Sequence, residues 1–81
     1  MSAGQMLSAA RAARGMTLEE LADATKLRAS ILAAMELDDF SHCGGLVYAR
    51  GQLRSIAPVL GLDPDDLVDA FDDGLGRRPL D

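Results

Sequence analysis

His42 and Cys43 carry the side chains best suited to metal binding or nucleophilic catalysis, and they are neighbours in the sequence. A structural zinc site takes a tetrahedral set of cysteine and histidine ligands, whereas this chain has one cysteine and one histidine. A catalytic thiol needs a converging histidine and a third group that orients it, and adjacent residues before a Gly-Gly pair rarely supply this. We therefore expect a non-enzymatic protein with no metal, no cofactor and no small-molecule substrate.

Aspartates near the C-terminus form the second set of candidate metal ligands. They are Asp63, Asp65, Asp66, Asp69, Asp72 and Asp73. Their spacing lacks the central glycine and the closing glutamate of an EF-hand calcium loop. Asp63 before Pro64 is instead typical of a helix start, and further acids suit the positive end of the helix dipole. We expect a capped helix with a solvated acidic face.

The net charge of −5 and the pI of about 4.6 are unfavourable for binding DNA or an anionic membrane. Cationic residues could oppose this field locally if the helices bring them together. They are Arg14, Lys26, Arg28, Arg50 and Arg54. Two interpretations stay open: a stripe that contacts phosphates, or side chains that merely solvate helical surfaces. The overall charge favours the second interpretation.

The chain of 81 residues has room for one domain with one modest core. A single cysteine cannot form an internal disulfide, which fits a reducing compartment. We find no signal peptide and no run of about 18 apolar residues that could span a membrane, so we expect a cytoplasmic domain. The glycine-rich and arginine-rich end predicts a folded domain over residues 1–73 and a linker or tail over 74–81.

Apolar residues at helical spacing predict three helices in the first half of the chain. The first covers residues 4–14 and ends at Gly15, which favours a left-handed C-cap. Thr17 and Glu20 form a capping box that starts the second helix. A tight turn separates it from the third helix. The residues expected to face the core are Leu18, Leu21, Ala22, Ile31, Leu32, Met35 and Phe40.

Two more helices are predicted after an irregular connection over residues 38–45, which contains a Gly-Gly pair. The fourth helix covers residues 48–60 and is closed by Gly61. Pro58 lies inside it and has no amide hydrogen for the carbonyl of Arg54, so the helix either kinks or ends early. The fifth helix follows Asp63 and runs to about residue 73. It is expected to bury Leu67, Val68 and Phe71.

The stretch from Met16 to Glu36 resembles the helix-turn-helix of the lambda-repressor-like superfamily. The resemblance implies an all-α, five-helix domain. It also implies a structural ion pair between Arg11 and Glu36 that ties the first helix to the end of the third. Losing one partner of a buried pair costs about 3–5 kcal/mol. The alternative role for Arg11 is a phosphate contact.

The elements Glu36-Leu-Asp-Asp-Phe40, Val47-Tyr-Ala-Arg-Gly-Gln-Leu-Arg-Ser55 and Leu60-Gly-Leu-Asp-Pro-Asp-Asp-Leu67 narrow the family. Over residues 4–73 the chain resembles the cytoplasmic domain of the bacterial RodZ family, particularly its actinobacterial members. This resemblance implies a full-length protein with a linker, one transmembrane helix anchored in the inner membrane, and an extracytoplasmic region. It further implies a role in cell shape, envelope growth or division.

The resemblance also implies a protein partner, the actin-like filament protein MreB or another morphogenesis or division protein. The family docks through aromatic residues one turn apart near the start of the fourth helix. Here Tyr48 stands at the first position and Gln52 at the second, which weakens the expectation for MreB itself. Tyr48 has an alternative place in the core with its hydroxyl at the surface. Oligomeric state leaves no signal in the sequence.

DNA binding is the alternative function of a helix-turn-helix. The exposed positions of the second motif helix would be Arg28, Ala29, Ser30, Ile31, Ala33 and Ala34. Base edges are read mainly by hydrogen bonds, and only Arg28 and Ser30 could make them. In a regulator, Arg14, Lys26, Arg50 and Arg54 would contact phosphates. We therefore favour a protein-interaction adaptor over a DNA-binding transcriptional regulator.

Overall fold

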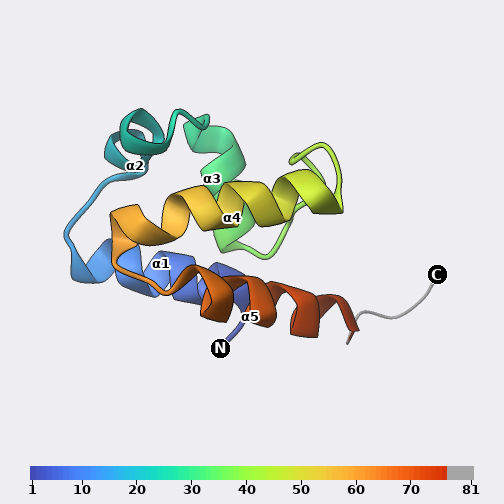
Figure 1. Ribbon diagram of the computed structural model, residues 1–81. Coiled ribbons are helices and arrows are strands. Elements are labelled where there is room, and N and C mark those ends of the chain that lie inside the picture. Colours follow the sequence, from blue (N-terminus) through green and yellow to red (C-terminus); the bar gives the residue numbers. More distant parts are fainter. Residues whose placement is uncertain (77–81) are drawn as a thin grey trace.

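Five helices make up residues 1–76, the part of the chain that the computed structural model describes (Figure 1). They are α1 (Ala3–Ala13), α2 (Leu18–Thr25), α3 (Ala29–Glu36), α4 (Leu46–Leu60) and α5 (Pro64–Gly76). No strand occurs within these residues. The predicted all-α, five-helix fold is confirmed.

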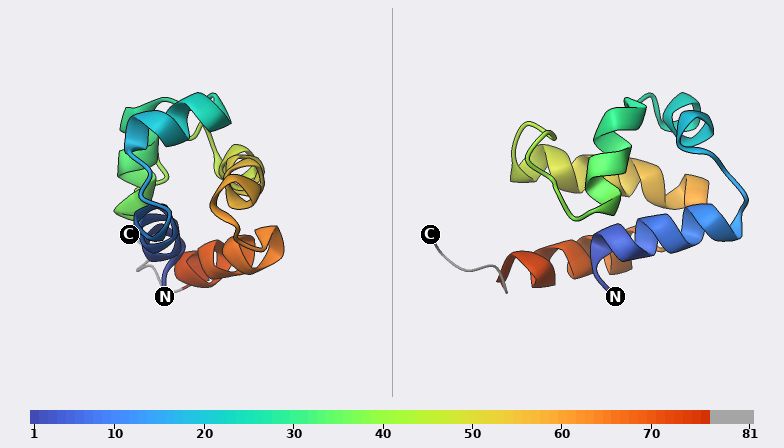
Figure 2. Two further views of the ribbon diagram at one scale, coloured as in Figure 1. Left: turned by 90° about the vertical axis from the view of Figure 1, so that its left-hand side faces the viewer. Right: turned by 180° about the vertical axis from the view of Figure 1, so that it is seen from behind.

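The helices surround one apolar core. In Figure 2, α1 and α5 lie side by side, α2 and α3 close the opposite side, and α4 lies between these two layers. Every helix contributes at least one fully buried large side chain. These are Leu7, Leu21, Leu32, Met35, Leu53, Ile56 and Leu67. Helix α4 packs against α1, α2 and α5.

Local hydrogen bonds start the helices where the sequence predicts. The Thr17 hydroxyl accepts from the Glu20 amide at 3.0 Å, and the Glu20 carboxylate accepts from the Thr17 amide at 3.0 Å. The Asp63 carboxylate accepts from the amides of Asp65 and Asp66 at 2.8 and 3.2 Å. Both predicted N-caps are confirmed. A further capping box, Ser2 with Gln5, starts α1 and was not predicted.

Two helices are longer than predicted. Helix α4 begins at Leu46, two residues before its predicted start, and it passes through Pro58 to its predicted end at Leu60, so of the two alternatives at Pro58 the early end is wrong. Helix α5 continues to Gly76, so Gly74–Gly76 is helical although it was predicted to belong to the linker. The rest of that predicted linker, 77–81, lies outside the described residues.

Phe40 reaches the core from outside a helix. Helix α3 ends at Glu36, and Asp38 adopts a left-handed conformation with φ 63°. The chain then returns Phe40 to the interior, where its ring meets the Phe71 ring edge-on at 4.7 Å between centroids. This aromatic pair fastens the connection between α3 and α4 to α5.

Helix α1 approaches the end of α3 very closely at Gly4. A Cβ atom on Gly4 would lie 2.6 Å from the Met35 carbonyl oxygen and 2.7 Å from Asp38 Oδ1. Asp38 also binds the start of α1, because its carboxylate accepts from the Gly4 amide at 2.8 Å and from the Ser2 hydroxyl at 2.7 Å. The helix-turn-helix is therefore seated firmly on α1.

Candidate interaction surface

Arg11 and Glu36 form a two-pronged ion pair inside the domain. Arg11 Nε donates to Glu36 Oε2 at 2.7 Å, and Arg11 Nη2 donates to Glu36 Oε1 at 3.0 Å. The remaining nitrogen, Nη1, donates to the Met16 carbonyl at 2.9 Å. Hydrogen bonding to Glu36 raises the pKa of Arg11. Since all three guanidinium nitrogens are engaged, the geometry favours the structural role of Arg11 over a phosphate contact.

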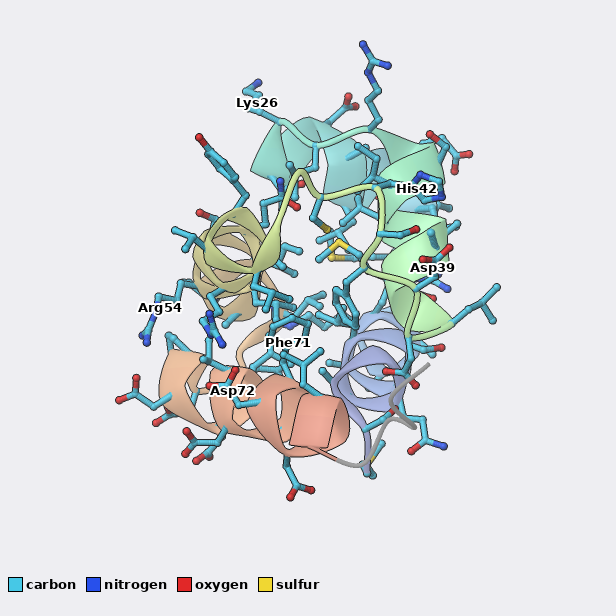
Figure 3. The ribbon with its side chains drawn as sticks, turned by 90° about the vertical axis from the view of Figure 1, so that its right-hand side faces the viewer. Lys26, Asp39, His42, Arg54, Phe71 and Asp72 are labelled. Carbon is cyan, nitrogen blue, oxygen red and sulfur yellow. The ribbon has the colours of Figure 1, made fainter. Side chains whose placement is uncertain are left out.

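Two of the five candidate phosphate-binding cations, Arg50 and Arg54, are engaged by α5, and Figure 3 labels Arg54 together with Lys26. Arg50 pairs with Asp72 at 2.9 Å and lies over the Phe71 ring, 5.9 Å from its centroid. Arg54 pairs with Asp65 at 3.0 Å. Both arginines are thus turned toward α5, whereas Lys26 stands at the far end of the molecule in this view. Arg50 and Arg54 therefore do not join Lys26 in one phosphate-binding stripe.

Of the other three cations, Lys26 and Arg28 lie in the turn of the helix-turn-helix. Arg28 is the N-cap of α3 and is exposed, as is Ser30. Together with Ile31, Ala34 and His42 they line a depression of about 360 Å³. His42 comes from the connection after α3, with its Nε2 3.5 Å from Asp39 Oδ2, and the sequence did not place it on this face. Arg14 instead packs its guanidinium against Gly61 at the end of α4.

The first turn of α4 presents apolar side chains to solvent. Leu46, Val47 and Tyr48 are 51%, 78% and 66% exposed. The alternative place for Tyr48 in the core is therefore wrong. Three consecutive large apolar side chains are not needed to form the helix. Exposed apolar patches on small proteins mark sites where another molecule binds.

Tyr48 and Gln52 line one groove, which we call the α2–α4 groove. Its volume is about 230 Å³, and its lining consists of Thr25, Leu27, Val47, Tyr48, Gly51, Gln52 and Ser55. The end of α2 supplies one wall and α4 the other. None of these lining residues is charged. The sequence drew attention to Tyr48 and Gln52 but missed Thr25 and Leu27, because nothing local shows that the motif turn packs beside α4.

The Gln52 amide is poorly satisfied in this position. Its Nε2 donates to the Cys43 carbonyl at 3.4 Å, which is a long hydrogen bond. Its Oε1 is buried and has no hydrogen-bond partner among the described residues. Buried polar atoms without a partner are uncommon in folded proteins.

A helix-turn-helix domain family matches residues 6–67, which is most of the chain. The protein belongs to this helix-turn-helix family. The cytoskeleton protein RodZ of Streptococcus pneumoniae is 37% identical over 71 residues, covering 88% of this chain and 26% of RodZ. The chain therefore spans about a quarter of that relative. The predicted RodZ-like helix-turn-helix domain is confirmed.

A solved structure extends the comparison to three dimensions. YmfM of Staphylococcus aureus, a membrane protein to which DNA binding has been ascribed, superimposes with a TM-score of 0.81 at 30% identity. The match covers 90% of this chain and 89% of that one. Neither relative's name describes an enzyme. Within residues 1–76, no helix of the present chain is both long enough and apolar enough to cross a bilayer.

Proposed function

We propose that this helix-turn-helix is the cytoplasmic adaptor domain of a RodZ-like, membrane-anchored protein acting in cell shape, envelope growth or division. It docks a protein partner, an MreB-like filament or another morphogenesis protein, through the start of α4. The carrying observation is the exposed apolar turn of Leu46, Val47 and Tyr48 beside the α2–α4 groove.

The chemistry of this surface suits a protein better than a nucleic acid. Tyrosine is among the residues that most often dominate binding energy at protein interfaces, because its ring is large, rigid and amphipathic. Leu46 and Val47 add exposed apolar area beside the Tyr48 ring, and the groove lining carries no charge with which to bind phosphate. The RodZ relative is named as a cytoskeleton protein, which supports a cytoskeletal partner for the present domain.

The proposal is tested with the Tyr48→Ala variant and the actin-like filament protein of the same organism, in a co-sedimentation assay. We expect the wild-type domain to sediment with filaments and Tyr48→Ala to bind at least about 30-fold more weakly. Leu37→Ala is the matched control, since Leu37 is 82% exposed but does not line the groove. Equal loss in both variants, or no binding by the wild type to this filament or to division proteins, would contradict the proposal.

The second candidate function is DNA binding by a transcriptional regulator, which the description of YmfM favours. In it, Arg28 and Ser30 would enter the major groove from α3 while Lys26 contacts phosphate. Two polar side chains supply little base recognition, and the net charge of −5 opposes approach to a polyanion. Duplex binding measured at about 150 mM salt with unrelated competitor DNA separates the two functions, because non-specific attachment weakens steeply with salt. Nanomolar binding to one sequence under these conditions would favour the regulator.

A further inference from the structure

We propose that the α2–α4 groove selects its partner through Gly51 and Gln52. Its occupant is an amphipathic helix of another protein, which crosses α4 at Gly51, donates a neutral hydrogen bond to Gln52, and places an acidic residue near Lys26. This inference rests on the proposed adaptor function and names the chemistry of the segment that the adaptor recognises.

Gly51 has no structural reason to be a glycine. It lies in the middle of α4, where glycine is a poor helix former, and its φ is not in the left-handed region. A Cβ atom at this position would meet no atom within 4 Å. The fold would therefore accept alanine or a larger residue. What the missing side chain does create is open space along the wall of the α2–α4 groove.

Ser55 continues this open wall one turn later. Gly51 and Ser55 both line the groove, and the Ser55 hydroxyl is turned back onto the Gly51 carbonyl at 3.2 Å. Two small residues four apart on one helix face let a second backbone approach closely. Val47 and Tyr48 flank them on the same groove. Small residues with apolar residues on either side form a surface on which a second helix can pack across α4.

Gln52 supplies the polar specificity of the groove. Its Oε1 is buried without a hydrogen-bond partner, and the one hydrogen bond of the amide, from Nε2 to the Cys43 carbonyl, is long at 3.4 Å. Because little is lost when this bond breaks, the side chain can swing the amide away from the Cys43 carbonyl and offer Oε1 to a partner in the groove. A partner side chain that donates there satisfies an acceptor that the free domain leaves unpaired.

The charges around the groove determine which helices suit it. Lys26 lies in the turn between Thr25 and Leu27, two lining residues, and it makes no ion pair with any residue from Met1 to Gly76. Its side chain projects away from the core in Figure 3. By contrast, Arg50 and Arg54 on α4 are already paired with aspartates of α5. The unpaired cation at the rim therefore favours an acidic residue on the occupant.

The test uses a displayed library of peptides of about 18 residues, or about five helical turns, selected against the intact chain. We expect amphipathic sequences with an acidic residue and with serine, threonine, asparagine or glutamine at one fixed position. The Gly51→Leu variant fills the groove and should bind the selected peptides at least about tenfold more weakly. Gly74→Leu is the matched control, because Gly74 also lies in a helix with open space at its Cβ position but does not line this groove. Circular dichroism should show both variants folded.

A second selection, against Gln52→Leu, tests the hydrogen bond. We expect the fixed polar position to become apolar, because leucine offers no acceptor and a buried donor would then be unpaired. The same consensus from both selections, or no enriched peptide at all, would overturn the proposal. Filament binding is measured separately with the same proteins. If filaments bind and the consensus does not shift, the selection rule fails while the adaptor function stands. If filaments do not bind and the consensus shifts, the adaptor function fails while the selection rule stands.

Discussion

The Arg11 guanidinium and the Glu36 carboxylate meet in two parallel hydrogen bonds, at 2.7 and 3.0 Å, across the gap between α1 and the end of α3. The glutamate side chain is 10% exposed and the arginine side chain 22%. A third bond, from Arg11 to the Met16 carbonyl, holds the connection that leads into α2. One side chain therefore fastens both ends of the helix-turn-helix to α1.

Replacing Glu36 with leucine leaves Arg11 charged and without its carboxylate. We expect a loss of about 2–4 kcal/mol in the free energy of unfolding, below the full cost of a completely buried charge because Arg11 keeps some contact with water. The double variant Arg11→Met with Glu36→Leu should lose less than Glu36→Leu alone, since no unpaired charge remains. Urea unfolding at neutral pH measures the double variant and both single variants, Arg11→Met and Glu36→Leu. A double variant that loses the sum of the single losses would show that the pair is not coupled.

Adding one methyl group to Gly4 should destabilise the domain. The new Cβ atom would overlap the Met35 carbonyl and the Asp38 carboxylate, so α1 must move away from α3, at a cost of about 1–3 kcal/mol. Gly74→Ala is the control and should leave the free energy of unfolding unchanged or raise it by up to about 1 kcal/mol, because its Cβ position is open. Thermal unfolding followed by circular dichroism compares the two. Equal midpoints would refute the close approach of α1 to α3.

The Asp63→Ala variant removes the N-cap of α5. Two backbone amides, of Asp65 and Asp66, lose their acceptor, and we expect the free energy of unfolding to fall by about 1 kcal/mol. Asp69→Ala removes the same charge from the exposed face of α5 without removing a cap, so its effect should stay below about 0.5 kcal/mol. Chemical denaturation at one ionic strength measures both. A larger effect at Asp69 would indicate that net charge, and not capping, controls the stability of α5.

Cys43 should react slowly with thiol reagents in the folded protein. Its side chain is buried, and burial, followed by the negative charge of Asp39, raises the pKa of the Cys43 thiol. Above the ordinary thiol pKa of about 8.5 the unfolded chain loses a proton that the folded chain keeps, so stability falls as pH rises. Urea midpoints between about pH 7 and pH 10 should fall more steeply for the wild type than for Cys43→Ala. Parallel slopes would place the thiol in contact with water.

The sequence by itself determined the starts of α2 and α5 and the end of α4, but it missed the capping box of α1, the first two residues of α4 and the last three of α5. Thr17 with Glu20 and Asp63 before Pro64 predict N-caps that the structure contains, because a cap is a set of hydrogen bonds within four residues of the chain. Gly61 ends α4 in the left-handed conformation for an equally local reason. The family resemblance also rested on residues that lie within short segments.

Only the tertiary structure decided which side chains from distant segments meet. It turned Arg50 and Arg54 toward the aspartates of α5, and it carried Phe40 from a connection onto Phe71. It also placed Gln52 beside Thr25 and Leu27. These residues line one groove, and the Oε1 atom of Gln52 is buried there without a hydrogen-bond partner. The spacing of apolar residues in a segment determines which face of a helix is apolar. Which other helix covers that face depends on how all five helices pack around one core.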